Sequence, residues 1–252
     1  MAKKNDYKLP EVAAADSKQH IPFAVVESYK TIRTNLRFIL TKNACKKVVF
    51  SSSNVAEGKS TTTINTAIAF AQLGSKVLLL DADIRRPSIA KKMKITNKQG
   101  LSSVLVDFCD VREAIVNVNP HLDVLPAGPI PPNPSELLGS NRMEELLEDL
   151  SRVYDYIFID TPPVNVVSDA LVISNKTDGL VFVVQDLMTT HKEFQKSLSS
   201  IEFANVKLLG VVLNASSNGK SDRYRYRYRY RYRYNYNYNY NYNYNYNYKS
   251  SK

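Results

Sequence analysis

Cysteine and long apolar segments are scarce in this sequence. Its 252 residues include two cysteines, Cys45 and Cys109, whose separation matches neither a C-x-x-C pair nor a metal-ligand spacing. Two isolated thiols favour a protein whose cysteines stay reduced, as in the cytoplasm, over a disulfide-bonded secreted domain. No apolar run approaches the ~18–20 residues that span a bilayer, and residues 1–20 lack the apolar core of a signal peptide. We therefore expect a soluble cytoplasmic protein that reaches a membrane only through a partner.

Acidic residues are almost missing from the C-terminal end. Residues 220–252 hold nine Lys or Arg residues and one Asp, a net charge of +8, whereas the whole chain has a formal net charge of +10. The rest of the chain is therefore nearly neutral, which counts against a nucleic-acid-binding domain. Alternating arginine and tyrosine can contact phosphates and stack on bases. Nucleic-acid binding is thus a minor alternative, and we expect no nucleic-acid partner.

Tyrosine occupies every second position from Tyr224 to Tyr248, with arginine and then asparagine between. This low-complexity segment has no apolar core positions, so disorder is predicted there. Residues 1–20 are polar and have no apolar period either. The predicted organisation is a flexible arm at 1–20, one domain at 21–215 and a disordered tyrosine-rich tail at 216–252.

Between these ends, short apolar runs alternate with amphipathic stretches. Strands are predicted at 46–51, 76–81, 122–128, 154–160, 179–185 and 206–214, and helices at 23–40, 59–74, 111–118, 135–153, 167–176 and 190–203. Several strands are apolar at consecutive positions, which is typical of a parallel sheet covered on both faces. The predicted fold is a doubly wound α/β domain of the P-loop NTPase type, with a mostly parallel sheet flanked by helices. Its ligand chemistry should lie at the carboxyl ends of the strands.

The stretch "SNVAEGKST", residues 53–61, follows the first strand and opens a helix. Gly58, Lys59 and Ser60 match the end of the P-loop pattern, whereas Ser53 stands where the first glycine is usual. Backbone N–H groups at a helix N-terminus bind phosphate oxygens, a P-loop lysine reaches the β- and γ-phosphates, and the following hydroxyl ligates Mg²⁺. The predicted nucleotide-binding residues of this loop are Glu57, Gly58, Lys59, Ser60 and Thr61.

Carboxylates follow two of the buried strands. Asp81 and Asp83 end the second predicted strand, where a period of two places both side chains on one side of the pleat. Asp160 ends another buried strand. Hard cations prefer oxygen ligands, so these residues and the P-loop together predict a site for ATP and Mg²⁺. The alternative is that Asp81 and Asp160 are helix caps or loop residues.

These motifs resemble those of the bacterial tyrosine kinases (BY-kinases), over about residues 23–215. "LLLDADIRRP" resembles the second Walker-type motif of that family, "IFIDTPP" its Walker B motif and "AEGKST" its Walker A motif. "GPIPPNPSELL", "LLGVVLN" and a tyrosine-rich C-terminus are also similar to family segments. "ESYKTIRTNL" resembles the Glu-x-x-Arg-x-x-Arg oligomerisation motif through Glu27, Lys30 and Arg33, where Lys30 keeps the charge of the first arginine but not its bidentate fork.

The resemblance implies an ATP-dependent autophosphorylating tyrosine kinase of capsule and exopolysaccharide synthesis and export. The missing membrane span fits the Gram-positive type, in which the cytoplasmic kinase and its activator are separate chains. The implied partners are the cytoplasmic end of a membrane polysaccharide co-polymerase, further copies in a homo-oligomeric ring, and a cognate phosphotyrosine phosphatase. The co-polymerase would recruit the kinase to the inner face of the plasma membrane.

In that reaction, Ser60, Asp83 and Asp160 are expected to bind Mg²⁺ directly or through water. Asp81 is the candidate to accept or orient the tyrosine proton, because a phenol with a pKa of about 10 needs help to attack; the division of work between Asp81 and Asp83 is open. Asn214 is expected either to meet the adenine edge or to be a plain turn residue. The predicted phosphoacceptors are Tyr224, Tyr226, Tyr228, Tyr230, Tyr232, Tyr234, Tyr236, Tyr238, Tyr240, Tyr242, Tyr244, Tyr246 and Tyr248.

Three interpretations stay open at this point. The face formed by Glu27, Lys30 and Arg33 either pairs with a neighbouring subunit or is a solvated helix face. Arg85 and Arg86 either bind phosphate or a neighbouring chain, or are solvated loop residues. The alternative function is a P-loop switch ATPase of the partition and division-site type, but that group carries a second lysine where this chain has Asn54.

Overall fold

A seven-stranded sheet forms the centre of the computed structural model, which describes residues 22–41 and 45–215. The predicted arm at 1–20 and tail at 216–252, with all thirteen acceptor tyrosines, lie outside the described residues. The strand order is β3-β4-β2-β5-β1-β6-β7, and each neighbouring pair is parallel except β3 with β4. The strands are β1 Lys46–Ser52, β2 Val77–Asp81, β3 Val116–Asn119, β4 Leu122–Leu125, β5 Tyr156–Asp160, β6 Gly179–Gln185 and β7 Leu208–Asn214.

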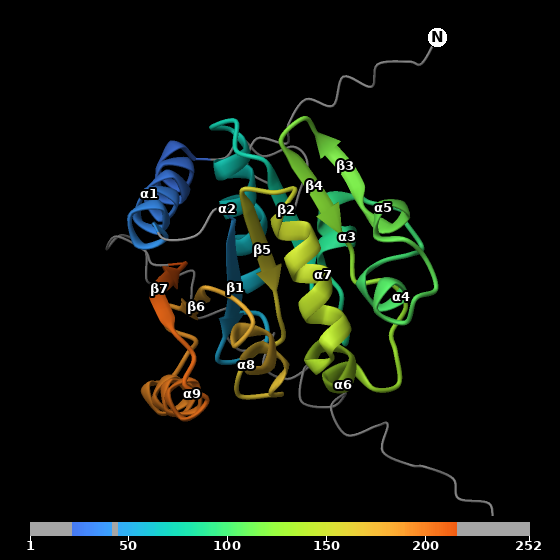
Figure 1. Cartoon of the computed structure of the whole chain (residues 1–252). Coiled ribbons are helices and arrows are strands. Elements are labelled where there is room, and N and C mark those ends of the chain that lie inside the picture. The colour runs from blue at the N-terminus through green and yellow to red at the C-terminus, as the bar shows by residue number, and fades with distance from the viewer. Residues whose placement is uncertain (1–21, 42–44, 216–252) are drawn as a thin grey trace, which may run out of the picture. The chain divides into compact units, whose positions relative to one another are not determined.

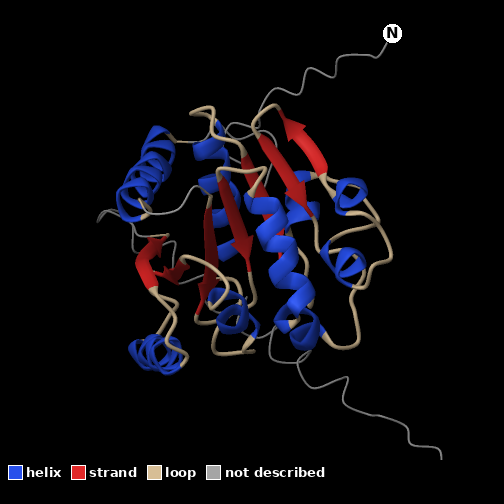
Figure 2. Ribbon diagram, viewed as in Figure 1, coloured by secondary structure: helices blue, strands red, loops and turns tan. Residues whose placement is uncertain are grey.

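Helices cover both faces of this sheet, so the predicted doubly wound α/β architecture is confirmed (Figures 1 and 2). One face packs against α1 Phe23–Ile39, α2 Lys59–Ala71 and α3 Ile89–Met93. The other face packs against α4 Leu101–Leu105, α5 Val111–Ala114, α6 Pro134–Gly139, α7 Asn141–Ser151, α8 Asp169–Ser174 and α9 His191–Phe203.

The central strands are apolar at consecutive positions because successive side chains enter two different cores. In β5, Ile157 and Ile159 join the core under α7 and α8, whereas Phe158 joins the core under α2. Phe158 there packs against Phe70 of α2, with ring centroids 5.0 Å apart. Burying one such side chain stabilises the fold by roughly 1.5–3 kcal/mol, and burial on both faces suits a strand in the middle of the sheet.

Two predicted helices differ from the structure. The stretch 111–118 is helical only over α5, because Val116–Asn119 pairs as the antiparallel strand β3 with β4. The stretch 135–153 is two helices, broken at Ser140, which has an extended backbone and caps α7 by accepting a hydrogen bond from the Met143 N–H. The short helices α3 and α4 were not predicted, since five residues are too few to show a helical period.

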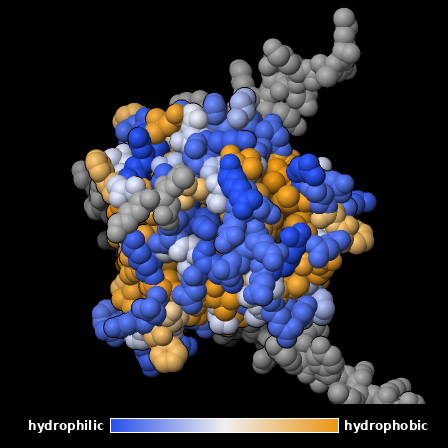
Figure 3. Space-filling view, in the orientation of Figure 1, coloured by the Kyte–Doolittle hydropathy of each residue, from blue (hydrophilic) through white to orange (hydrophobic). Residues whose placement is uncertain are grey.

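The alternation of apolar and charged residues along α7 explains why its exposed side is hydrophilic. Met143, Leu146, Leu147 and Leu150 point into the core, which leaves the charged residues of this helix outside. The middle of the face shown in Figure 3, where α7 lies in Figure 1, is accordingly hydrophilic. Across the part of the chain that the structure describes, no helix combines the length and the apolar character needed to cross a membrane.

Candidate active site

Three parallel strands bring the predicted site residues to one end of the sheet. β1 leads into the loop at residues 53–58 and then into α2, whose first residue is Lys59. β2 and β5 end at Asp81 and Asp160, and these two residues face each other in the register of the sheet. Parallel neighbours necessarily place their carboxyl ends at the same edge. The loop and the carboxylates are therefore neighbours, as their motifs predicted.

Lys59 is the centre of this arrangement. Its Nζ lies 2.9 Å from Asp83 Oδ2, 3.3 Å from Ser60 Oγ and 3.5 Å from both carboxylate oxygens of Asp160. Burial by itself would lower the pKa of Lys59, but the carboxylates of Asp160 and Asp83 outweigh that effect and raise it. The neighbouring carboxylates thus favour the charged form of the buried Lys59 side chain.

The carboxylates outnumber this single cation. Burial, and next the charge of Asp160, raises the pKa of Asp81 to about 8. Burial also raises the pKa of Asp160, although Lys59 opposes it. A bound cation would relieve the crowding of negative charge, and the donor atoms are the hard oxygens that Mg²⁺ prefers.

The chain alone does not complete a metal site. Among the described residues, no group of three or more His, Cys, Asp or Glu side chains is arranged to hold a metal ion. Mg²⁺ in nucleotide sites usually takes one or two carboxylates, and its other ligands are phosphate oxygens and water. The donor atoms of Ser60, Asp83 and Asp160 therefore fit Mg²⁺ that arrives with a nucleotide, and these residues would hold it.

Asp81 is fully buried and acts on the backbone around it. Its Oδ1 accepts a hydrogen bond from the Asp83 N–H at 3.2 Å, and its Oδ2 accepts from the N–H groups of Ser88 and Ile89 at 3.2 and 3.0 Å. These bonds shape the turn that carries Asp83 and secure the start of α3. The structure thus brings Asp83, rather than Asp81, into hydrogen-bond contact with Lys59.

Gly58 and Asn214 fit closely together. Gly58 has a φ of +89°, and a Cβ atom at this position would lie 2.0 Å from Asn214 Nδ2. The Asn214 side chain donates a hydrogen bond to the Glu57 carbonyl oxygen at 3.0 Å. Asn214 therefore supports the loop from the end of β7. From the sequence we expected it to meet adenine or to be a plain turn residue, and this contact with the loop was not predicted.

Glu57 turns its side chain into the protein. Its carboxylate is buried and accepts hydrogen bonds from the Asn54 N–H at 3.1 Å and from Thr189 Oγ1 at 2.7 Å. Burial raises the pKa of Glu57 above its ordinary value. The Glu57 side chain thus braces the loop from inside.

The start of α2 has the backbone geometry of a phosphate-binding site. The first N–H groups of a helix have no intrahelical carbonyl to bind, and together with the helix dipole they attract anions. Ser60 is buried here beside Lys59, whereas Thr61 is partly exposed and its Oγ1 accepts a hydrogen bond from Lys92 Nζ at 3.0 Å. Gly58 to Thr61 thus fit a triphosphate.

Two contacts at the loop were not predicted. Thr189, in the connection between β6 and α9, holds Glu57, and Ser197 of α9 donates a hydrogen bond to Ser53 Oγ at 3.1 Å. Ser53, at the usual glycine position, is buried. Thr189 lies 132 residues from its partner and Ser197 lies 144 residues away. No local pattern in the sequence signals such pairs.

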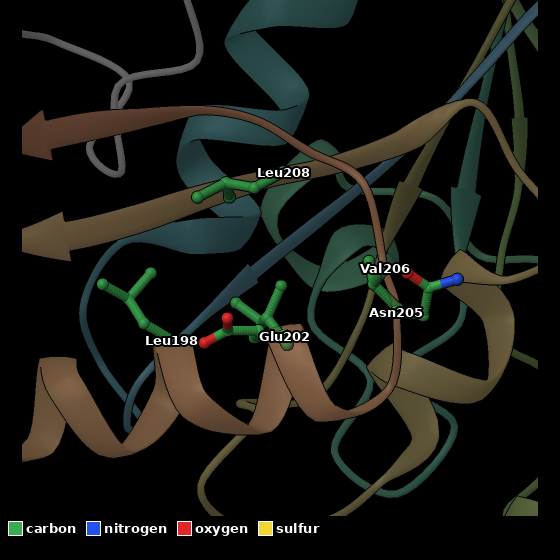
Figure 4. A pocket seen from close by; sticks show the side chains of 6 residues that line it. Leu198, Glu202, Asn205, Val206 and Leu208 are labelled. Atoms are coloured by element: carbon green, nitrogen blue, oxygen red, sulfur yellow. The ribbon is translucent and has the colours of Figure 1, made fainter.

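The other predicted residues lie outside this cluster. Glu27 and Lys30 form an ion pair within α1, with 2.7 Å between Oε1 and Nζ, and Arg33 Nη1 donates to the Ala69 carbonyl oxygen of α2 at 2.9 Å. Arg85 forms an ion pair with the buried Asp169 of α8. A shallow hollow between α9 and β7 contains none of the predicted site residues (Figure 4); it is lined by Leu198, Ile201, Glu202, Asn205, Val206 and Leu208.

The fold and site define a class, the P-loop nucleotide-binding proteins with carboxylates at two neighbouring strand ends. The sequence profile of the AAA domain accordingly matches residues 45–204. Within this class, the chain belongs to the bacterial tyrosine-protein kinase family. It is 41% identical over 199 residues to tyrosine-protein kinase YwqD of Bacillus subtilis (strain 168). The aligned region covers 79% of this chain and 84% of the relative.

Solved structures agree with that assignment. The kinase domain of Escherichia coli tyrosine kinase ETK superimposes with a TM-score of 0.74 at 31% identity, covering 81% of this chain and 84% of that domain. The chimerical protein CapA2B2 superimposes with a TM-score of 0.72 at 39% identity, covering 75% of this chain and 84% of the other. The family expected from the motifs is therefore confirmed.

Proposed function

We propose that this kinase transfers the γ-phosphoryl group of Mg²⁺-bound ATP to the tyrosines between residues 224 and 248 of copies of the same protein. This autophosphorylation regulates capsular or exopolysaccharide synthesis and export. The observation that carries the proposal is the Lys59 ammonium, held between Asp83 and Asp160 at the start of α2. The dense run of thirteen tyrosines supplies acceptors within the same protein.

Each site residue has a proposed role. ATP supplies the phosphoryl group, and Mg²⁺ neutralises its charge. Lys59 and the N–H groups of Glu57, Gly58 and Thr61 hold the phosphates, and the oxygens of Ser60, Asp83 and Asp160 hold the ion directly or through water. Asp83 has one oxygen on the Arg86 N–H and the other on Lys59, so we give it the metal. We assign the acceptance of the tyrosine proton to Asp81, whose pKa burial raises to about 8 and whose backbone hydrogen bonds fix its orientation.

The partners of the reaction follow from the family. We propose that the cytoplasmic end of a membrane polysaccharide co-polymerase activates the kinase and recruits it to the inner face of the plasma membrane. Copies of the chain form a ring in which Glu27, Lys30 and Arg33 of α1 contribute, and a phosphotyrosine phosphatase reverses the modification. In the single chain, Arg33 already contacts α2, so its remaining donors are the ones available to a neighbour.

Incubation with labelled ATP tests the activity. The purified full chain, alone and with the cytoplasmic fragment of its co-polymerase, should accumulate phosphotyrosine, and mass spectrometry should place it within residues 224–248. Lys59→Met should abolish the signal, because it removes the cation that holds the phosphates. Lys98→Met, which changes an exposed lysine, should behave like the unmodified protein.

One result would separate the proposed kinase from a switch ATPase. If ATP binds and is hydrolysed but phosphate appears only in solution, with no phosphotyrosine in any mixture, the kinase proposal fails. The partition and division-site type would then be favoured, although its second lysine is replaced here by Asn54, whose N–H donates to Glu57.

A further inference from the structure

Arg85 connects the turn after β2 to the helices α6 and α8. Its Nε lies 2.7 Å from Asp169 Oδ2, and its Nη2 lies 3.3 Å from Asp169 Oδ1 and 2.8 Å from Ser135 Oγ. Ser135 Oγ in turn donates a hydrogen bond to Asp169 Oδ1 at 2.6 Å. The guanidinium therefore binds the Asp169 carboxylate through both Nε and Nη2. Its Nη2 also donates a hydrogen bond to the Ser135 hydroxyl.

The partners of Arg85 come from segments near the other site elements. Asp169 is the first residue of α8, nine positions after Asp160, and it is fully buried. Ser135 belongs to α6, in the stretch "NPSELL". The contact thus joins the connection after β2, the connection after β5 and α6, which are far apart in the sequence.

The turn that Arg85 anchors carries Asp83. The Asp83 N–H donates to Asp81 Oδ1 at 3.2 Å, and the Arg86 N–H donates to Asp83 Oδ1 at 3.1 Å. The remaining oxygen, Asp83 Oδ2, faces Lys59 at 2.9 Å. Asp81 holds this turn at its beginning and Arg85 holds it near its end, so Asp83 lies between two fixed points.

We propose that Asp169 is a positioning residue for phosphoryl transfer: together with Ser135 it clamps Arg85 and thereby fixes the turn on which Asp83 meets Lys59. A bidentate arginine–carboxylate pair sets direction as well as distance. A buried ion pair is weak evidence for stability and better evidence for a specified geometry. The inference rests on the proposed kinase function, because the position of Asp83 matters through that reaction.

Asp169→Asn in the full chain tests this, since it keeps the shape of the side chain and removes its charge. We expect kcat for phosphotyrosine formation to fall about tenfold or more, because small displacements of a positioned group cost large factors in rate. The midpoint of the Mg²⁺ titration should rise, while the Kd of ATP should change by less than about threefold. Arg85→Lys should resemble Asp169→Asn, because it keeps the charge but loses the fork.

A double-mutant cycle separates positioning from general damage. If Asp169 acts through Asp83, then Asp169→Asn should add little to the loss already caused by Asp83→Asn. A full additional loss in the Asp83→Asn protein would overturn the inference, and so would a folded Asp169→Asn protein with unchanged kcat and Mg²⁺ midpoint. The matched control is Asp107→Asn, which breaks the more exposed Asp107–Arg142 pair and should leave both quantities unchanged.

Two further measurements keep the test decisive. If Asp169→Asn does not fold, Ser135→Ala removes the two hydrogen bonds that Ser135 Oγ makes in the clamp and should lower kcat about two- to tenfold. Without nucleotide, urea unfolding of the Arg85→Lys, Ser135→Ala and double variants should show coupling between the two positions; additive effects would contradict the clamp. Absence of phosphotyrosine in the unmodified protein would instead contradict the proposed function.

Discussion

Lys59 is a single ammonium group beside three carboxylates, and this imbalance explains much of the site. Asp81 and Asp160 end buried strands, and Asp83 lies two residues after Asp81. Backbone N–H groups satisfy Asp81, whereas Asp83 and Asp160 face the lysine. Residues of one type, close in sequence and in space, thus take different roles because their hydrogen-bond partners differ.

Gly58 is the residue where the loop tolerates least change. Gly58→Ala should strongly weaken ATP binding and lower the free energy of unfolding, because the new Cβ would meet Asn214 Nδ2 at 2.0 Å. The matched control is Gly74→Ala, which has a similar φ of +84° but no atom within 4 Å of the new Cβ. It should show only the backbone strain of about 1–2 kcal/mol and bind ATP normally, as urea unfolding and fluorescent-nucleotide titration would show.

The second half of that test uses Asn214. Asn214→Ala removes the obstructing side chain, so the Gly58→Ala/Asn214→Ala protein should recover part of the stability lost by Gly58→Ala alone. Purely additive losses would contradict the steric explanation. The contact at issue joins the end of β7 to the P-loop, so recovery of ATP binding would be only partial.

The two thiols differ in burial and should differ in reactivity. Burial raises the pKa of the Cys45 thiol from 9.0 to about 11, and Cys109 is partly exposed. At pH 8, a thiol reagent should therefore modify Cys109 in the native protein and Cys45 only after unfolding in urea. Cys109→Ser should leave almost no native reaction; rapid labelling of that variant would contradict the burial of Cys45.

The same shift predicts a pH effect with a defined sign. The unfolded chain releases the Cys45 proton near pH 9, whereas the folded state keeps it to about pH 11. The unfolded state then binds fewer protons over that window, so the free energy of unfolding falls as the pH rises from 9 to 11. Cys45→Ala should show a smaller fall, measured by urea unfolding at several pH values.

At the scale of elements, Ser140 separates two helices that one apolar pattern would join. Its Oγ accepts a hydrogen bond from the Met143 N–H at 3.3 Å and donates one to the Leu137 carbonyl oxygen at 2.7 Å. Ser140→Ala should lower the free energy of unfolding by about 1 kcal/mol, the usual effect of losing an N-cap. Ser200→Ala, inside α9, should be neutral or slightly stabilising because alanine is the better helix former.

Elements with a local pattern were predictable from the sequence. The ends of β1, β2 and β5 were recognisable because buried parallel strands are continuously apolar, and the topology of such sheets then placed Lys59, Asp83 and Asp160 together. β3 was not predictable, because its two valines fit a helical pattern as well as a strand. Only the pairing with β4 makes this segment a strand. Contacts such as Arg85 with Asp169, 84 residues apart, have no local pattern, so only the folded chain shows them.

At the scale of the whole molecule, the charge of residues 220–252 governs the expected behaviour. Unmodified, this segment has a net charge of +8. Each phosphotyrosine adds about −1.5 to −2 at pH 7, so filling the thirteen acceptors would add roughly −20 to −26. If these tyrosines are the acceptors, as proposed, their number makes the charge graded, and its sign reverses after about the fifth phosphate.

This reversal predicts a change in self-association. If copies of the chain assemble through neighbouring active sites, extensive phosphorylation should drive the segments out of those sites by repulsion from the carboxylates, and the assembly should loosen. Sedimentation velocity would compare the chain incubated with Mg²⁺-ATP against Lys59→Met, which should stay assembled. A full chain with phenylalanine at all thirteen tail tyrosines controls for nucleotide binding alone. Phosphorylated protein that sediments like the Lys59→Met protein would rule out the switch, even if phosphotyrosine formation is confirmed.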